Sequence, residues 1–431
     1  MEQPLDSSIT FTLGQWPISS GKFLGPRLAE LANVAASRMA EKTNINGSEE
    51  KADARDRSID VLRGMTSFAM VLVNTAGPVR PSWLSHPTSF DQPITFADKK
   101  RNPSGFLHSG KYTLFPCFIF TSGLASARSK RSGGEHSPWY KTTMRAMKLN
   151  LLGIAYNNLI PRLTGSHADG IFDFETYRIP SVLGRIGMTT MVCGLEAYMG
   201  LKPPILPAIL GLSWYLLAGL RPLTPLHASS QAWLDQLVFG AAHLHQPAPG
   251  FDPEGLLPSL LTVPISCLLG CYLARPLPQS FVATNIHTAQ LLAIGILGSL
   301  LTGLLPSPAS KVLWTPTYVG QTTVTSVLYW SLSKALVSLS SCSTLDPIIS
   351  ALEMLGQRSL EIYLISASAS FALDKLGAWG YIAHLINHHL IPTTLPPHLQ
   401  RDVVVGLARS SLLGLAMFPL AKLLVRFGWK I

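Results

Sequence analysis

Long apolar stretches constrain the fold of this chain more than any other feature. A helix that spans a bilayer needs about 20 mostly apolar residues. Stretches near that length occur at 59–77, 112–127, 146–161, 179–199, 203–220, 256–275, 287–305, 313–338, 359–377 and 403–425. Only 13% of the residues are charged, whereas ordinary soluble domains carry about 25%. We therefore predict an all-α fold, a polytopic integral membrane protein with about ten transmembrane helices.

Charged segments predict the domain organisation and the orientation. Residues 1–55 lack the basic start and apolar core of a signal peptide, so we expect a partly disordered cytosolic tail before a transmembrane domain over 56–431. The segment 128–148 is rich in Lys and Arg, which predicts a cytosolic loop. Both termini then face the cytosol, in an endomembrane such as the endoplasmic reticulum or in the plasma membrane. The opposite loop, 78–111, is also basic and conflicts with this orientation.

The net charge of +10 is better explained by basic cytosolic loops than by nucleic-acid binding, because no basic patch is interleaved with aromatic residues. The five cysteines have no zinc-ligand spacing. His243 and His245 alternate without a third ligand nearby. We therefore expect no metal site, no disulfide framework and no nucleic-acid partner. The expected partners are the lipid bilayer and a small or lipophilic substrate, and a homodimer is left open.

Cationic side chains next to the apolar stretches have two interpretations. Asp60 and Arg63 are three residues apart and share a helix face, which suits a structural ion pair. Alternatively, Arg63 with Arg178 and Arg185 forms an anion site, because the arginine fork binds phosphate bidentately. Arg178 and Arg185 are seven residues apart, so they would share a face on one helix.

Three further polar residues are candidates for chemistry. Asn74 lies near the end of an apolar stretch and would donate to an oxyanion or bond a neighbouring helix. Asp252 and Glu254 precede another apolar stretch. They suit an N-cap and a first-turn acid, or a catalytic role in which one of them orients a base or binds a polar acceptor.

Seven stretches, in order, resemble one family. They are "SIDVLRGMTSFAMVLVN", "LFPCFIFTSGLA", "KLNLLGIAYN", "YRIPSVLGRIG", "FDPEGLLPSLLTVPISCLLGCYLA", "KVLWTPTYV" and "LEMLGQRSLEIYLIS". Together they resemble the heparan-α-glucosaminide N-acetyltransferase family of transmembrane acyltransferases, of which this chain would be a divergent member. The resemblance implies transfer of an acyl group from cytosolic acyl-CoA, as co-substrate, to a hydroxyl or amine of a small or lipophilic acceptor.

The resemblance also implies a catalytic histidine, which matches His108 in "FLHSGKYTLFP". The family has a Trp-Asn-Gly and then an Asp between this histidine and its Phe-Pro, and both are missing here. Two other functions therefore stay open. One is a membrane cyclase or isomerase, similar to terpene cyclases, in which Asp252 or Glu254 starts the reaction as an acid without CoA. The other is a transporter, since intramembrane charges suit it equally.

Overall fold

The computed structural model describes residues 56–76, 110–131, 139–163, 173–199, 205–245, 250–274, 289–294, 296–297, 305, 307, 309–339, 344–386 and 401–428. The chain divides into two compact units, Met1–Arg55 and Asp56–Ile431, and all described residues belong to the second unit. The predicted cytosolic tail over 1–55 lies outside the described residues, so its placement stays a prediction.

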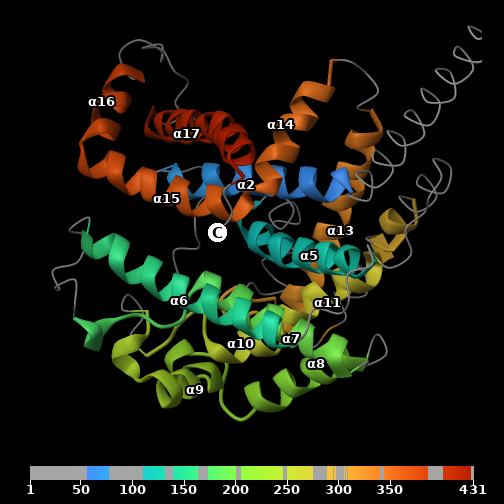
Figure 1. Cartoon of the computed structure of the whole chain (residues 1–431). Helices are drawn as coiled ribbons and strands as arrows, with labels where there is room; N and C mark the ends of the chain where they lie inside the picture. Colours follow the sequence, from blue (N-terminus) through green and yellow to red (C-terminus); the bar gives the residue numbers. More distant parts are fainter. Residues whose placement is uncertain are drawn as a thin grey trace, which may run out of the picture. The chain divides into compact units, whose positions relative to one another are not determined.

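Every regular element in the described ranges is a helix, which confirms the all-α prediction for that part of the chain (Figure 1). The α-helices are α2 (Arg57–Thr75), α5 (Gly110–Arg131), α6 (Trp139–Leu163), α7 (Val182–Met199), α8 (Ile205–Ala218), α9 (Ser230–Phe239), α10 (Leu256–Leu260), α11 (Val263–Ala274), α13 (Pro316–Ser338), α14 (Asp346–Gln357), α15 (Ser359–Lys375), α16 (Ala378–Leu385) and α17 (Arg401–Arg426). Short 3-10 turns η1 (Phe174–Thr176), η2 (Leu226–Ala228) and η3 (Ala241–His243) join some of them.

The apolar stretches of the sequence correspond to helices wherever the structure describes them. The stretch 256–275 is divided into α10 and α11, because the helix is interrupted at Leu261 and Thr262. The stretch 287–305 lies mostly outside the described residues. Helices α9, α14 and α16 were not predicted. With 10, 12 and 8 residues they are too short for a spanning helix.

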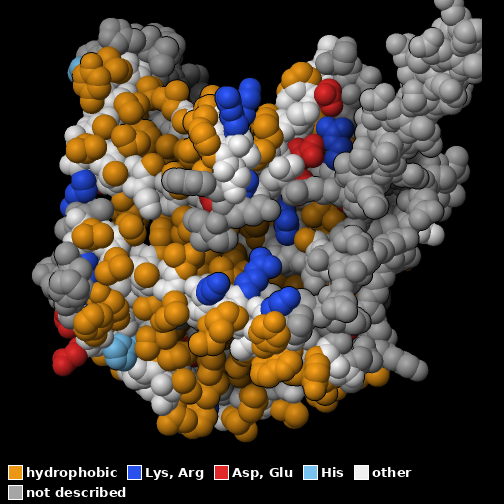
Figure 2. All heavy atoms as spheres, viewed as in Figure 1, with side chains coloured by type: hydrophobic (Ala, Val, Ile, Leu, Met, Phe, Trp, Pro, Cys, Tyr) orange, Lys and Arg blue, Asp and Glu red, His pale blue; other side chains and the backbone are white. Residues whose placement is uncertain are grey.

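Within the part of the chain that the structure describes, two helical segments, Leu256–Ala274 and Val403–Arg426, are long and apolar enough to cross a membrane. Helices in the core of a soluble protein meet the same criterion, so these segments support membrane association only weakly. Large apolar side chains are also exposed on the outer helices, where Figure 2 shows broad hydrophobic surfaces. Examples are Leu195 on α7, Leu212 and Leu216 on α8, and Leu412 and Leu415 on α17. The predicted number of about ten spans stays a prediction.

Glycines set the contact between α2 and α14. A Cβ added to Gly64 would collide with the carbonyl oxygen of Leu352, and a Cβ added to Gly356 would collide with that of Asp60. Small residues let helix backbones approach this closely. Asp60 is buried in this contact, at 3% exposure. The contact holds α14 against α2 and so places the start of α15 beside the same helix, where a pocket forms.

Candidate functional site

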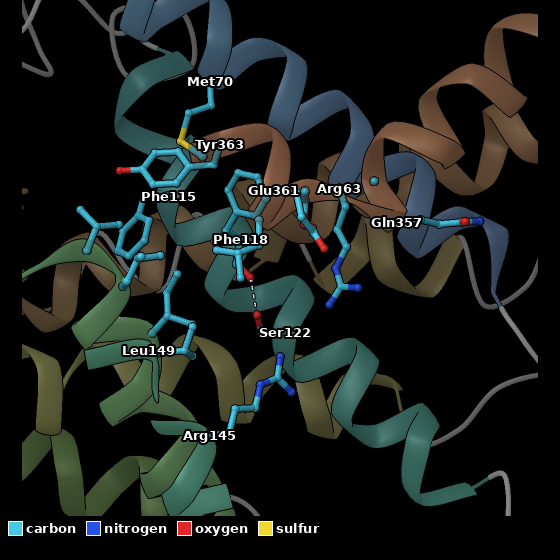
Figure 3. A pocket seen from close by; sticks show the side chains of 16 residues that line it. Arg63, Met70, Phe115, Phe118, Ser122, Arg145, Leu149, Gln357, Glu361 and Tyr363 are labelled. Atoms are coloured by element: carbon cyan, nitrogen blue, oxygen red, sulfur yellow. Dashed lines mark hydrogen bonds between the residues drawn. The ribbon is translucent and has the colours of Figure 1, made fainter. Parts of the chain in front are cut away.

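A pocket of about 240 Å³ lies among α2, α5, α6, α7 and the α14–α15 junction. Figure 3 shows its lining side chains converging from these helices. Its apolar lining comes from residues on α2, α5, α6, α7 and α15, namely Met70, Phe115, Phe118, Leu149, Val182, Leu183, Ile186 and Leu360. An apolar pocket with a few polar groups is the usual form of a small-molecule site.

Two arginines lie on opposite walls of this pocket. Arg63 extends from α2 and Arg145 from α6, and in Figure 3 they reach into the space between these helices. Arg145 is exposed, and no described residue forms an ion pair with it. Arg63 is partly buried. Two guanidinium groups at one apolar pocket are chemically suited to an anion with an apolar part, since each can form charge-assisted hydrogen bonds to phosphate.

Acidic and hydroxyl side chains complete the polar part of the pocket. Glu361 on α15 is buried and forms an ion pair with Arg358, with 3.7 Å between Oε1 and Nη1. Its carboxylate lies on the same side of the pocket as Arg63 (Figure 3). Ser122 on α5 donates its hydroxyl hydrogen to the carbonyl oxygen of Phe118 at 2.9 Å. Glu361 therefore adds one negative charge to a lining that also contains Arg63 and Arg145.

A second polar cluster forms where the segment before α7 meets the segment before α10. The Arg178 guanidinium binds Asp252 through two hydrogen bonds, Nε–Oδ2 at 2.8 Å and Nη2–Oδ1 at 2.7 Å. Arg178 also forms an ion pair with Glu254. The amide of Asn158 on α6 bonds the Arg178 backbone, accepting from its N–H at 2.8 Å and donating to its carbonyl at 2.9 Å. This network joins α6, α7 and α10.

Arg185 on α7 contacts the same segment as Arg178. Its Nε donates to the Ser259 hydroxyl at 3.1 Å, and its Nη2 donates to the Pro253 carbonyl. Its guanidinium carbon lies 4.9 Å from the centroid of the Trp314 ring. Arg178 and Arg185 thus contact the same segment of the chain, 252–259, but contrary to the prediction they do not share a helix face. Arg178 lies in an extended segment before α7 rather than on the helix.

These partners change the interpretation of the predicted anion site. Of its three arginines, Arg63 lines the described pocket, whereas Arg178 and Arg185 bind groups of the protein itself. Burial raises the pKa of the Glu254 carboxyl, but the charges of Arg178 and Arg185 outweigh it and hold that pKa below its ordinary value. Glu254 is therefore an ionised partner of the arginines and is poorly suited to donate a proton.

Asp235 on α9 was missed by the sequence analysis and performs the capping that we expected from Asp252. The N-cap of α10 is Gly255, and the Leu256 N–H donates to Asp235 Oδ1 at 2.7 Å. Asp252 instead accepts from the Glu254 N–H at 2.9 Å. The prediction that Asp252 is the N-cap was wrong, because Gly255 holds that position and the Leu256 N–H group donates to Asp235 from α9. No local pattern in the sequence shows this contact.

The other oxygen of Asp235 lacks a partner. Oδ2 is buried and makes no hydrogen bond with any described residue. It packs against Gly255, where an added Cβ would collide with it. Burial, reinforced by the charge of Asp252 and opposed by the Leu256 hydrogen bond, raises the pKa of the Asp235 carboxyl to about 7. Asp235 is therefore largely protonated below neutral pH.

The remaining predicted site residues are dispersed. Asn74 is exposed on the last turn of α2. His108 lies outside the described residues, so its distance from the pocket is not defined. His243 uses its Nδ1 for a 2.8 Å hydrogen bond with the Tyr177 carbonyl. Among the described residues, no group of three or more His, Cys, Asp or Glu side chains is arranged to hold a metal ion.

Comparison with known proteins does not identify the chain. No protein-family model matches it, and no curated protein matches it either. The resemblance to transmembrane acyltransferases therefore rests on its sequence motifs, and the pocket with Arg63 and Arg145 is the structural feature from which a function can be argued.

Proposed function

We propose that this chain is a multi-pass membrane acyltransferase that binds acyl-CoA in the pocket between α2 and α6. The observation that supports this most is the placement of Arg63 and Arg145 on opposite walls of an apolar pocket. The phosphates of CoA are suitable partners for the two arginine forks, and the acyl chain suits the apolar lining.

The orientation predicted from the sequence fits this ligand. Arg145 belongs to the basic segment 128–148 that we expect in the cytosol, and Arg63 belongs to the first turns of α2, which follows the expected cytosolic tail. Lys and Arg side chains gather over α6 in Figure 2. A pocket mouth on this side would open where acyl-CoA is dissolved.

The reaction requires a base and donors for the developing oxyanion. In the proposed reaction the acceptor's hydroxyl or amine attacks the thioester carbonyl. A new C–O or C–N bond forms, the C–S bond breaks, and the acceptor's proton passes through the base to the CoA thiolate. His108 is the proposed base, through the family resemblance. Asn74 is the proposed oxyanion donor, near the start of the segment that leads to His108.

The alternative cyclase reaction needs a protonated acid to start it. Asp252 and Glu254, its candidates, are both bound by Arg178. Although burial opposes them, the charges of the arginines hold the pKa of Glu254 below its ordinary value, whereas burial raises the pKa of Asp252 despite the same arginine. Glu254 therefore donates a proton poorly, and both carboxylate oxygens of Asp252 accept hydrogen bonds from the Arg178 guanidinium. The contacts of these two acids therefore favour acyl transfer over acid-initiated cyclisation.

The test is titration of the purified protein with acetyl-CoA and a long-chain acyl-CoA. Arg63→Gln and Arg145→Gln should each weaken binding about 10-fold or more, because each removes a charge-assisted hydrogen bond worth about 1.5–3 kcal/mol. Lys141→Gln, which removes an exposed positive charge of α6 outside the pocket, is the control and should bind normally. Wild-type protein that does not bind acyl-CoA, or a control that loses as much affinity, would contradict the proposal.

Product analysis separates the remaining functions. Incubation with labelled acetyl-CoA and a membrane lipid extract should give a product that is heavier by an acyl group, and His108→Ala should abolish it. A product of unchanged mass formed without CoA would instead indicate an isomerase or cyclase.

A further inference from the structure

Helix α9 has an inverted distribution of polar and apolar side chains. Ser230, Gln231 and Asp235 are buried, whereas Trp233 and Leu237 are exposed at 44% and 67%. A helix on the surface of a soluble protein shows the opposite pattern, with its apolar stripe toward the core. The outer face of α9 is therefore the face that requires an apolar environment.

Hydrogen bonds explain why the polar face points inward. Gln231 donates to the Asp252 carbonyl at 2.7 Å, and Asp235 accepts from the Leu256 N–H at 2.7 Å. Both contacts attach α9 to the segment that leads into α10. Because these bonds fix the rotation of α9 about its axis, Trp233 and Leu237 cannot turn inward without breaking them.

The apolar face of α9 continues onto α8. Leu216 and Leu220 are exposed at 65% and 70%. A cavity of about 290 Å³ lies between the end of α8, α9 and α10, and its lining includes Leu217, Leu220 and Leu257. Helix α8 is one of the predicted membrane helices, so its exposed leucines would face lipid. The exposed apolar side chains of α9 continue this surface, although α9 lies outside the predicted membrane stretches.

Among the described lining residues of this cavity, Arg221 is the one cation. Arg221 is exposed, and its guanidinium carbon lies 5.1 Å from the centroid of the Trp233 ring. A cation over an indole face is a stabilising contact that leaves the edge of the guanidinium open to an anion. Tryptophan and arginine together are typical of the layer where lipid headgroups meet acyl chains.

We propose that α9 lies in the headgroup layer of the bilayer and that Arg221 and Trp233 bind the phosphate of an anionic phospholipid, with an acyl chain along Leu217 and Leu220. The inference rests on the proposed membrane placement but not on acyl-CoA chemistry. It changes the predicted path of the chain, because α9, which lies between the predicted membrane helices 203–220 and 256–275, lies at the bilayer instead of away from it.

The depth of α9 can be measured by fluorescence. The full-length protein is reconstituted in nanodiscs of phosphatidylcholine with and without brominated acyl chains, which quench tryptophan on contact. Trp233→Phe should remove a large part of the quenchable emission. The control is Trp214→Phe, which removes a tryptophan of α8 that is only 2% exposed and should leave the quenchable part nearly unchanged. Equal quenching of wild type and Trp233→Phe would overturn the interfacial placement.

The phosphate site needs a separate measurement. Native mass spectrometry of protein purified from nanodiscs that contain phosphatidic acid should show a retained lipid, and Arg221→Gln should reduce its occupancy several-fold. The control Lys141→Gln should retain it. Unchanged retention in Arg221→Gln would refute the phosphate site. A dimer in detergent that dissociates in Leu237→Gln would show that a second copy, rather than lipid, covers this face.

Failure of these tests is distinguishable from failure of the proposed function. Acyl-CoA titration of the same nanodiscs reports on the pocket with Arg63 and Arg145, which shares no lining residue with the cavity at Arg221. Arg221→Gln should therefore bind acyl-CoA as the wild type does.

Discussion

Replacing Asp235 by asparagine should stabilise the protein at neutral and alkaline pH but not in acid. The carboxyl is fully buried, and its pKa rises from 3.8 to about 7 in the folded protein. Between these values the folded state holds a proton that the unfolded state has released. The free energy of unfolding therefore falls by about 1.4 kcal/mol per pH unit as the pH rises, until the carboxyl ionises near pH 7.

The size of the effect follows from the same shift. A displacement of about 3 units corresponds to about 4 kcal/mol, which is lost from the wild type as the pH rises from about 4 to above 7. An asparagine keeps the acceptor oxygen for the Leu256 N–H and is neutral at every pH. Gln231, one turn earlier on the same face, has a buried Oε1 with no described hydrogen-bond partner. It is an acceptor available to the new amide.

Thermal unfolding in one detergent, between about pH 5 and pH 8, tests this prediction. The quantity to follow is the stability of Asp235→Asn minus that of the wild type, because other titrating groups cancel in this difference. It should increase with pH and level off near pH 7. The control Asp374→Asn removes an exposed carboxyl outside α9 and should change the stability little. A constant or decreasing difference for Asp235→Asn would refute the argument that this acid is protonated in the fold.

Two further predictions concern packing and the polar cluster. Gly64→Ala should destabilise the protein by about 1–3 kcal/mol or more, because its methyl group would collide with the Leu352 carbonyl. Gly211→Ala, whose methyl group would meet only ordinary contacts, should be neutral or stabilising in the same thermal assay. Arg178→Ala should cost about 3–5 kcal/mol because it leaves the Asp252 charge buried and unpaired. Adding Asp252→Asn should recover part of that loss, and a purely additive double variant would contradict the pairing.

Much of the fold could be predicted from local sequence. Long apolar stretches become helices because a buried backbone must satisfy its own hydrogen bonds, and this requirement acts within each segment. This requirement predicts the helices α2, α6 and α13. It also makes Arg63 a site candidate, because a charge at the start of an apolar stretch is unusual. The helices α9, α14 and α16 are shorter than a membrane-spanning stretch, so a search for long apolar stretches could not find them.

The tertiary structure decided which polar groups meet. Only the placement of α2 and α6 around one pocket brings Arg145 opposite Arg63, and only the approach of α9 lets Asp235 take the capping role expected of Asp252. The same approach turns Trp233 outward. The sequence by itself determines where the long apolar helices form, because hydropathy and backbone hydrogen bonding are properties of one segment. Partners, burial and pKa depend on segments far apart in the chain, and they are determined when the helices pack.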